Sequence, residues 1–520
     1  MTKPNYGETV RLTVAQALLK FISAQYSVSD GVRRRFVPAA MGIFGHGNVA
    51  GLGQALDQYS DILPFVQGRN EQGLAHAATA FAKQSKRKQV IAVTASVGPG
   101  SMNMITAAAL ATVNRVPLLL LPGDVYTTRR QGPVLQQLED PSAPDISSND
   151  AFRPVSKFFD RITRPEQLLY SLPQAFRVLA SPTDTGAVVI SLPQDIQSHA
   201  FDWPVEFFNE REWKIRRSVP AQDDVEAAAK IISAAKNPVI IAGGGITYSG
   251  ATPELEALAN ATGIPVCETF GGQSAVQNPG DWFMYGIGLE GAPHTNRLVE
   301  KADVVISIGT RLTDFATASQ SIFLNPNVKF VSINVTELDA FKQGATPILG
   351  DAKLSITALA KALGGYKVPS EWSNEVKTQI SDWKSVRDAA INPDNLFDKK
   401  NVPDSPNTDA VLTQGQLIAL MREASKPGDV MITAAGGAPG DILKVWDATG
   451  GRFTHTEFGY SCMGYEIPAA MGVRFATPDT SKRVISFLGD GTFVMAPTEI
   501  VTAAQEGVDV TFVVSENHGY

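Results

Sequence analysis

Short runs of β-branched residues alternate along this chain with longer, Ala-rich stretches in which apolar residues recur at helical spacing. Three such runs are "QVIAVTASVGPG", "NPVIIAGGG" and "RVISFLGDG", and each ends in glycine before an amphipathic stretch. Continuous apolar runs predict strands that are buried on both faces, and their alternation with helices predicts parallel sheets. The pattern starts three times, so we expect an α/β fold with three doubly wound parallel-sheet domains.

Polar, Pro-rich stretches at residues 208–224 and 366–409 separate the three segments in which strands and helices alternate. Such composition is typical of linkers, and the second stretch has a helix-like middle and a loop-like end. The third domain is short for a complete sheet, and the family resemblance described below implies that it is truncated at its C-terminal end. The predicted boundaries are an N-terminal domain at 1–215, a central domain at 216–365, a linker at 366–405 and a C-terminal domain at 406–520.

Composition favours small-molecule chemistry. The chain has 520 residues, 44% of them hydrophobic, and a net charge of -7 without a long basic block, so neither nucleic acid nor an anionic membrane is an expected partner. Apolar runs such as "VPLLLLP" are far shorter than the roughly 20 residues of a membrane span. The two cysteines, Cys267 and Cys462, fall in different predicted domains, which excludes a disulfide framework and fits a cytoplasmic location.

A carboxylate and a carboxamide follow two neighbouring strands near the end of the chain. Asp490 lies between Gly489 and Gly491 after "RVISFL", and Asn517 follows "VDVTFVV". Parallel strands bring their carboxyl ends to one edge of the sheet, where open α/β folds bind ligands. Oxygen ligands of this kind suit Mg²⁺ completed by diphosphate oxygens and water. The alternative is an ordinary βα turn at Gly-Asp-Gly.

This spacing resembles the cofactor motif of thiamine diphosphate enzymes of the acetohydroxyacid synthase-like superfamily. The resemblance implies that Mg²⁺ is bound by Asp490, Asn517 and the main-chain carbonyl of Gly519. "ITAAGGAPGD" then supplies Gly436 and Gly437 for the diphosphate, together with the backbone at Gly489 and Gly491. Such family members require a glutamate that activates the aminopyrimidine ring of the cofactor.

The stretch "QGRNEQGLAHAATAFAK" resembles the glutamate helix of the family and assigns the activating, cofactor-binding carboxyl to Glu71. The alternative is a solvated glutamate at a helix N-terminus. "GYSCMGYEIPAA" resembles the stretch whose bulky residue supports the bent cofactor, which assigns that role to Met463, although a methionine is more often core filling. "TASVGPGSMN" resembles the pyrimidine-domain signature and gives Asn103 a positioning role.

The central domain resembles that of acetohydroxyacid synthases, some of which bind FAD. "IIAGGG" alone is not a dinucleotide fingerprint, so FAD is possible but unsupported.

Histidines are few, and one of them marks a departure from the family pattern. His46 lies in "GIFGHGNVAGLG", where acetohydroxyacid synthases have a Tyr-Pro-Gly-Gly-like turn, and we predict that it handles protons as a catalytic residue. His76 follows Glu71 by five residues and could be structural, and His518 flanks a metal ligand without being one.

The whole chain, from "RLTVAQALLKFISAQY" to "SENHGY", resembles the trihydroxycyclohexane-1,2-dione hydrolases of myo-inositol catabolism. The resemblance implies a hydrolase that opens the ring of a polyhydroxylated cyclic diketone at a carbon-carbon bond and yields 5-deoxy-glucuronic acid. Candidate contacts for the substrate hydroxyls and water are Asn48, Arg69 and either Gln136 or Gln137, beside His46.

Two other functions stay open at this point. One is an acetohydroxyacid synthase-like carboligase of 2-keto acids, and the other is a non-catalytic regulator on the same fold. Glu71 argues against the regulator, because binding a diphosphate does not require that carboxyl. The family forms its active site between subunits, which implies a homodimer or a homotetramer.

Overall fold

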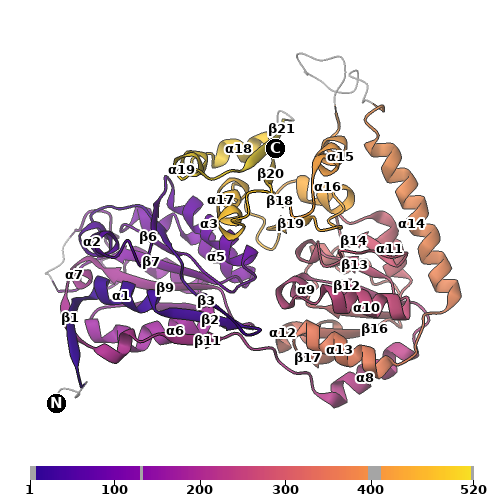
Figure 1. The fold of residues 1–520 in the computed structure, drawn as a ribbon, viewed down its shortest axis with the longest axis horizontal. Helices are drawn as coiled ribbons and strands as arrows, with labels where there is room; N and C mark the ends of the chain where they lie inside the picture. The colour runs from indigo at the N-terminus through magenta and orange to yellow at the C-terminus, as the bar shows by residue number, and fades with distance from the viewer. Residues whose placement is uncertain (1–6, 129–132, 396–411, 517–520) are drawn as a thin grey trace. The chain divides into compact units, whose positions relative to one another are not determined.

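The computed structural model describes residues 7–128, 133–395 and 412–516, and these form two compact units. The first unit contains the described residues up to Arg216 together with Cys462–Thr480 and Gly491–Phe512. The second contains Arg217–Ser461, Ser481–Asp490 and the described residues from Val513 onward. Figure 1 shows the elements of each unit with their labels. No helix in these described ranges is both long enough and apolar enough to cross a membrane.

A six-stranded parallel sheet forms the centre of the first unit. Each pair of neighbouring strands is parallel. The strand order is β5 (Phe65–Gln67), β4 (Ala40–Gly42), β6 (Ala92–Ala95), β7 (Leu118–Asp124), β9 (Ala187–Pro193), β8 (Phe158–Arg161). Two small sheets accompany it, β1 (Thr9–Thr13) with β10 (Ala200–Pro204), and β11 (Arg211–Lys214) with β2 (Gln25–Ser29) and β3 (Val32–Arg35).

Helices cover both faces of this sheet (Figure 1). On strand β7, Leu119 and Leu121 pack with α1 (Val14–Ser23) and α6 (Leu168–Leu179). Leu118 and Leu120 point to the opposite face and pack with α3 (Glu71–Gln84) and α5 (Ile105–Val113). Successive side chains of a strand alternate between faces, so the run of leucines predicted from the sequence buries both sets.

Helix α17 (Glu466–Ala476) packs along α3 within the first unit. A Cβ added at Gly472 would lie 2.0 Å from the carbonyl oxygen of Ala77, so only glycine allows this approach of the two backbones. Helix α19 (Glu499–Gln505) contacts α17. Three alanines of α3, Ala75, Ala78 and Ala82, are fully buried.

The second unit contains a six-stranded parallel sheet that matches the predicted central domain. Its strands follow the 3-2-1-4-5-6 order of dinucleotide-binding folds. They are β14 (Phe283–Gly286), β13 (Val266–Glu268), β12 (Pro238–Ala242), β15 (Val304–Ile308), β16 (Lys329–Asn334) and β17 (Thr346–Leu349). Helices α8 (Gln222–Ser233), α10 (Thr252–Thr262) and α13 (Ala352–Leu363) complete this part.

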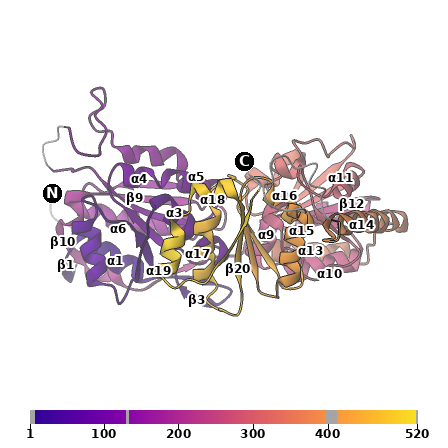
Figure 2. The same ribbon diagram turned by 90° about the horizontal axis from the view of Figure 1, so that it is seen from above.

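Helix α14 (Ser370–Ile391) occupies most of the stretch predicted as a linker. It packs against α11 (Pro293–Glu300) and β14, and Figure 2 shows it beside α11. Trp372, Val376 and Ile380, four residues apart, are buried along one side of it. The helix-like middle of this stretch is therefore a packed element of the second unit.

A four-stranded sheet completes the second unit, in the order β19 (Phe453–Thr456), β18 (Val430–Thr433), β20 (Val484–Gly489), β21 (Thr511–Ser515). Strand β18 runs parallel to β19 and β20. The 2-1-3-4 order is the one that β5, β4, β6 and β7 follow in the first unit. Helices α15 (Gln414–Ala424) and α16 (Ala438–Val445) pack together beside it. These parallel sheets confirm the α/β class, whereas the three domain boundaries stay predictions.

Candidate active site

The predicted N-terminal site residues gather at the carboxyl edge of the six-stranded sheet in the first unit. The turn with His46 follows β4, Glu71 follows β5, and residues 96–100 follow β6. These three strands are neighbours in the sheet, so their turns lie side by side. Open α/β folds bind their ligands at this edge.

Glu71 is the first residue of α3, and its carboxylate has two close neighbours. Oε2 accepts a hydrogen bond of 2.9 Å from Nδ2 of Asn103. Oε1 lies against Gly100, where an added Cβ would stand 3.1 Å away. Asn70 caps the helix by accepting the N–H of Gly73 at 3.1 Å. The structure thus brings together Glu71 and Asn103, which the sequence placed in separate motifs.

Glu499, on α19, holds the turn that presents Glu71, and sequence reasoning missed it. Its side chain is 1% exposed, and Oε1 accepts the backbone N–H groups of Arg69 at 3.2 Å and Asn70 at 2.8 Å. A Cβ added at Gly73 would lie 2.6 Å from Cγ of Glu499. Nothing in the local sequence signals this contact, since the two segments are more than four hundred residues apart.

His76 lies buried where α3 meets the start of the Met463 segment. Burial lowers the pKa of His76 to about 3, so the ring is neutral. Nε2 lies 3.7 Å from Sγ of Cys462 and 3.3 Å from Nε2 of Gln72, and Tyr465 packs edge-on with ring centroids 5.5 Å apart. These contacts give His76 the structural place that its spacing suggested. Met463 itself is partly exposed and belongs to the same unit as Glu71.

The turn after β4 is packed tightly against the turn after β6, while His46 is exposed. The N–H of Gly47 donates to Oγ of Ser96 at 3.1 Å, and an added Cβ on Gly47 would lie 2.5 Å from the backbone nitrogen of Val97. The backbone that follows His46 is therefore held in place, because Gly47 packs so closely on Val97 that no side chain fits there.

Asn48 was a candidate for binding substrate, but the structure uses its amide inside the protein. The side chain is 1% exposed. Oδ1 accepts the N–H of Gly45 at 2.9 Å, and Nδ2 donates to the carbonyl of Ile43 and to Oγ1 of Thr94, both at 3.1 Å. Asn48 thus shapes the His46 turn from within.

The two adjacent glutamines differ in their surroundings. Gln136 is exposed and has a φ of 61°, and its carbonyl oxygen would lie 2.0 Å from a Cβ at Gly98. Both amide atoms of Gln137 are buried and have no hydrogen-bond partner among the residues that the structure describes. Of the two glutamines, Gln137 is therefore the one whose amide can still hydrogen-bond to a ligand.

Arg69, another candidate for binding substrate, makes hydrogen bonds within the protein. Its guanidinium donates to the carbonyl of Gly68 at 3.2 Å and to Oε1 of Gln505.

The predicted diphosphate site lies at the carboxyl edge of the four-stranded sheet in the second unit. Gly436, with a φ of 78°, and Gly437 are exposed at the start of α16, after β18. Asp490 follows β20, the strand beside β18, and its Oδ1 is buried without a hydrogen-bond partner in the described ranges 7–128, 133–395 and 412–516. Added Cβ atoms at Gly436 and Gly489 would meet nothing within 4 Å.

These groups fit a diphosphate held through a divalent cation. Free backbone N–H groups at glycines bind anions, and a buried, unpaired carboxylate oxygen needs a cation or a proton. Asn517 and Gly519, the other expected ligands, and His518 lie outside the described residues. Within the described part of the chain no three His, Cys, Asp or Glu side chains cluster as metal ligands, and the expected set contains only one such side chain.

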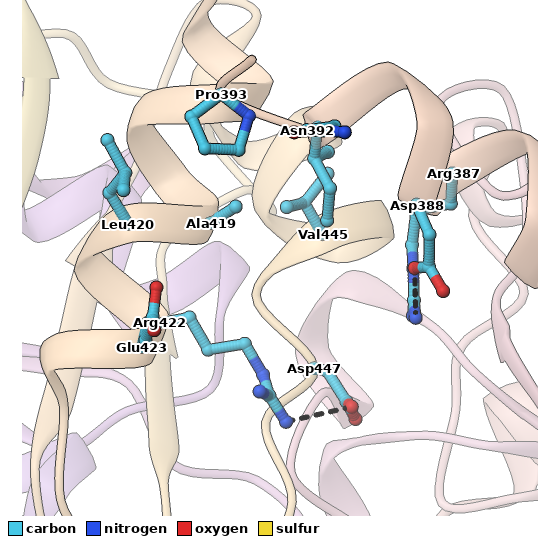
Figure 3. Close-up of a pocket in the computed structure, with 11 residues that line it drawn as sticks. Arg387, Asp388, Asn392, Pro393, Ala419, Leu420, Arg422, Glu423, Val445 and Asp447 are labelled. Carbon is cyan, nitrogen blue, oxygen red and sulfur yellow. Dashed lines mark hydrogen bonds and ion pairs between the residues drawn. The ribbon is translucent and has the colours of Figure 1, made fainter. Parts of the chain in front are cut away.

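A cavity of about 470 Å³ lies elsewhere in the second unit, between the end of α14, α15 and the end of α16 (Figure 3). Two ion pairs line it, Arg387 with Asp388 at 2.8 Å and Arg422 with Asp447 at 3.0 Å. Its other lining residues include Ile391, Pro393, Ala419, Leu420 and Val445. None of the predicted site residues lines this cavity, so we do not assign the chemistry to it.

The glycines after β12 are explained by close backbone packing. A Cβ at Gly245 would lie 2.6 Å from Cα of Gly309, and one at Gly244 would lie 2.7 Å from the carbonyl oxygen of Gly271. This packing accounts for the Gly-Gly-Gly turn without a ligand, and FAD remains an untested possibility.

Parallel-sheet domains with a glutamate at one sheet edge and a Gly-Asp-Gly turn at another define the class of thiamine diphosphate enzymes. Family models agree with that class. The N-terminal TPP binding domain of thiamine pyrophosphate enzymes matches residues 30–143, their central domain matches 225–359, and their C-terminal TPP binding domain matches 434–520.

Curated relatives narrow the class. The 3D-(3,5/4)-trihydroxycyclohexane-1,2-dione hydrolase of Bacillus cereus (strain AH820) is 43% identical over 524 residues, which cover 99% of this chain and 81% of the relative. The proteins of the same name from Clostridium botulinum (strain Alaska E43 / Type E3) and Clostridium tetani (strain Massachusetts / E88) are 42% and 41% identical with the same coverage. The chain therefore belongs to the thiamine pyrophosphate enzymes and, within them, to the family of these hydrolases, which confirms the resemblance found in the sequence.

Proposed function

We propose that this protein hydrolyses a carbon-carbon bond of 3D-(3,5/4)-trihydroxycyclohexane-1,2-dione, with thiamine diphosphate and Mg²⁺, and opens the ring to 5-deoxy-glucuronic acid. The observation that carries the proposal is the 41–43% identity to hydrolases of that name across 99% of the chain. The proposal places the reaction in the cytoplasm, in myo-inositol catabolism.

Glu71 and Asn103 have the clearest roles in this proposal. Thiamine diphosphate, when bound, supplies a nucleophilic carbon and an electron sink for the broken bond. Glu71 would hold the aminopyrimidine ring through a shared proton. Asn103 donates to Oε2 of Glu71, which fixes the carboxyl and leaves Oε1 to carry or release the proton.

The C-terminal groups would hold the diphosphate and the metal. Asp490, Asn517 and the carbonyl of Gly519 form the proposed Mg²⁺ set, and the unpaired Oδ1 of Asp490 supports its part. Backbone N–H groups at Gly436, Gly437, Gly489 and Gly491 would face the diphosphate oxygens. Met463 would support the bent cofactor with its apolar side chain.

Fewer observations support the proposed substrate contacts, His46 and Gln137, which we call the substrate layer. His46 is exposed at the sheet edge that carries Glu71, where an imidazole can accept and donate protons. Gln137 offers an amide without a partner, which suits a hydroxyl or the water that supplies the oxygen of the product acid. Asn48 is not among the proposed substrate contacts, because its amide is already hydrogen-bonded within the protein.

The deciding experiment supplies purified protein with thiamine diphosphate, Mg²⁺ and the cyclic dione, and follows the ring-opened acid by mass spectrometry. We expect an acid with one oxygen from water, detectable in H₂¹⁸O. The same protein with pyruvate tests the carboligase alternative. Acetolactate formed while the dione stays intact would replace the hydrolase by that alternative.

A further inference from the structure

Helix α7 (Gln194–Gln197) follows β9 at the carboxyl edge of the six-stranded sheet and contacts two loops of the proposed substrate layer. It is only four residues long, so its contacts are those of individual side chains. Gln197 reaches the His46 turn, and Asp195 reaches the segment that precedes Gln136 and Gln137. The family motifs named above do not include these two residues.

Gln197 braces both ends of residues 47–52. Its Nε2 donates to the carbonyl of Gly47 at 2.7 Å and to the carbonyl of Leu192 at 2.8 Å, and its Oε1 accepts the N–H of Leu52 at 3.2 Å. Two carbonyl acceptors fix which side of the amide carries the nitrogen. The side chain is 1% exposed, so it cannot reach substrate itself.

The chain makes room for Gln197 at Gly51. A Cβ there would lie 2.3 Å from Cβ of Gln197 and 2.5 Å from its Oε1. The peptide next to His46 is therefore tied to the core strand β9 through one side chain.

Asp195 accepts several hydrogen bonds from Thr127 and Thr128, which follow strand β7. Its carboxylate accepts the N–H groups of Thr127 at 3.1 Å and Thr128 at 2.7 Å, and the hydroxyl of Thr128 at 2.5 Å. Burial would raise the pKa of Asp195, but the hydrogen bonds from Thr128 and Thr127 outweigh it and hold the pKa below its usual range. Asp195 is thus a stable anion that anchors the start of the loop.

We infer that α7 positions the polar groups at this sheet edge, with Gln197 setting the His46 turn and Asp195 setting the backbone of Thr127 and Thr128. This inference rests on the proposed function, because that function assigns the groups at this edge to substrate. Both residues are positioning residues. Their effect on the reaction comes through side chains that they place, and a displacement of about 1 Å can cost on the order of 100-fold in rate.

The test is Gln197→Glu, which keeps the shape but turns a carboxylate oxygen toward two carbonyl oxygens. Gln416→Glu is the matched control, because Nε2 of Gln416 also donates to two carbonyls, of Asn392 at 2.8 Å and Asn395 at 3.0 Å, while its Oε1 accepts the N–H of Thr413 at 2.8 Å. Both variants should lose similar thermal stability. Only Gln197→Glu should lower kcat/KM for the dione, by roughly 10- to 100-fold, and alter the pH profile.

Thiamine diphosphate affinity separates positioning from general damage. We expect both glutamine variants to bind the cofactor within about twofold of the wild type, since neither residue contacts the proposed cofactor groups. Equal KM values and equal pH profiles in the two variants would overturn the inference. A wild-type protein without dione turnover would instead overturn the proposed function.

Asp195→Asn supplies a readout that needs no substrate. The variant should raise hydrogen exchange at the N–H groups of Thr127 and Thr128, because an amide nitrogen then faces these donors. In the dione assay, Asp195→Asn should also have a higher KM than the wild type. Unchanged exchange and unchanged KM would remove Asp195 from the inference.

Discussion

The two carboxylate oxygens of Glu71 have different surroundings. Oε2 accepts the hydrogen bond from Nδ2 of Asn103, whereas Oε1 lies beside Gly100, which has no side chain. In the proposed function, Asn103 would hold Oε2 while Oε1 shares a proton with a ring nitrogen of the cofactor.

Glu71→Gln tests this role directly. An amide keeps the shape but cannot share the acidic proton, so turnover should fall by about 10²- to 10⁴-fold. Thiamine diphosphate should still bind, since Asp490 and the glycine turns are unchanged. Calorimetry of cofactor binding, run beside the turnover assay, checks both statements. Unaltered turnover would show that the carboxyl of Glu71 does not activate the cofactor.

Buried histidines make the stability of the protein depend on pH. Burial lowers the pKa of His76 to about 3, and burial, with Arg297 and Arg387 nearby, lowers the pKa of His294 to about 3. Below the unfolded value of 6.5 the unfolded chain binds protons that the folded chain does not. The contribution of these two histidines to stability is therefore complete above pH 6.5 and decreases as the pH falls toward 3.

Thermal unfolding between pH 7.5 and pH 5 measures this dependence. His294 stacks on Trp383 with ring centroids 5.4 Å apart, so His294→Phe should keep the packing and remove its share of the pH effect. Each histidine contributes at most about 1.4 kcal/mol per pH unit. A variant with the same pH dependence as the wild type would contradict the assignment.

At the scale of elements, the contact between α3 and α17 depends on Gly472. A methyl group there would lie 2.0 Å from the carbonyl oxygen of Ala77, which is backbone and cannot turn aside. The two helices must separate to accept it. Because α17 follows Met463, the separation also disturbs the segment proposed to support the cofactor.

Gly472→Ala should therefore destabilise the protein by about 1–3 kcal/mol and weaken thiamine diphosphate binding. Gly365→Ala is the control, since an added Cβ at Gly365 would meet nothing within 4 Å. Thermal unfolding and cofactor titration of both variants make the comparison. Equal behaviour of the two variants would show that α17 adapts to the methyl group.

The sequence predicts elements better than contacts between distant elements. The strands in "QVIAVTA", "NPVIIA" and "RVISFL" follow from their continuous apolar runs, and the structure confirms them as β6, β12 and β20. The places of Asn48, Glu499 and Gln197 could not be predicted, because each depends on backbone groups brought close only by folding. The family resemblance supplied Glu71 and Asp490, whose local patterns also suit ordinary helix and turn positions.

At the scale of the whole molecule, the proposed cofactor groups belong to two units. Glu71 lies in the first unit and Asp490 in the second. In the proposed function one cofactor uses both groups, which can come from the same chain or from two chains. We propose that they come from two chains, in a homodimer or a homotetramer, and size measurement by light scattering would distinguish the two assemblies.

Mixing two inactive variants separates the arrangements within and between chains. In a mixed dimer of Glu71→Gln and Asp490→Asn chains, sites formed between subunits pair both substitutions in one site and leave the other site intact. Random assembly makes about half of the dimers mixed, so roughly a quarter of wild-type activity should return. Sites within one chain would each keep one substitution, and no activity would return. The mixture needs refolding or co-expression, and wild-type chains treated in the same way give the reference rate.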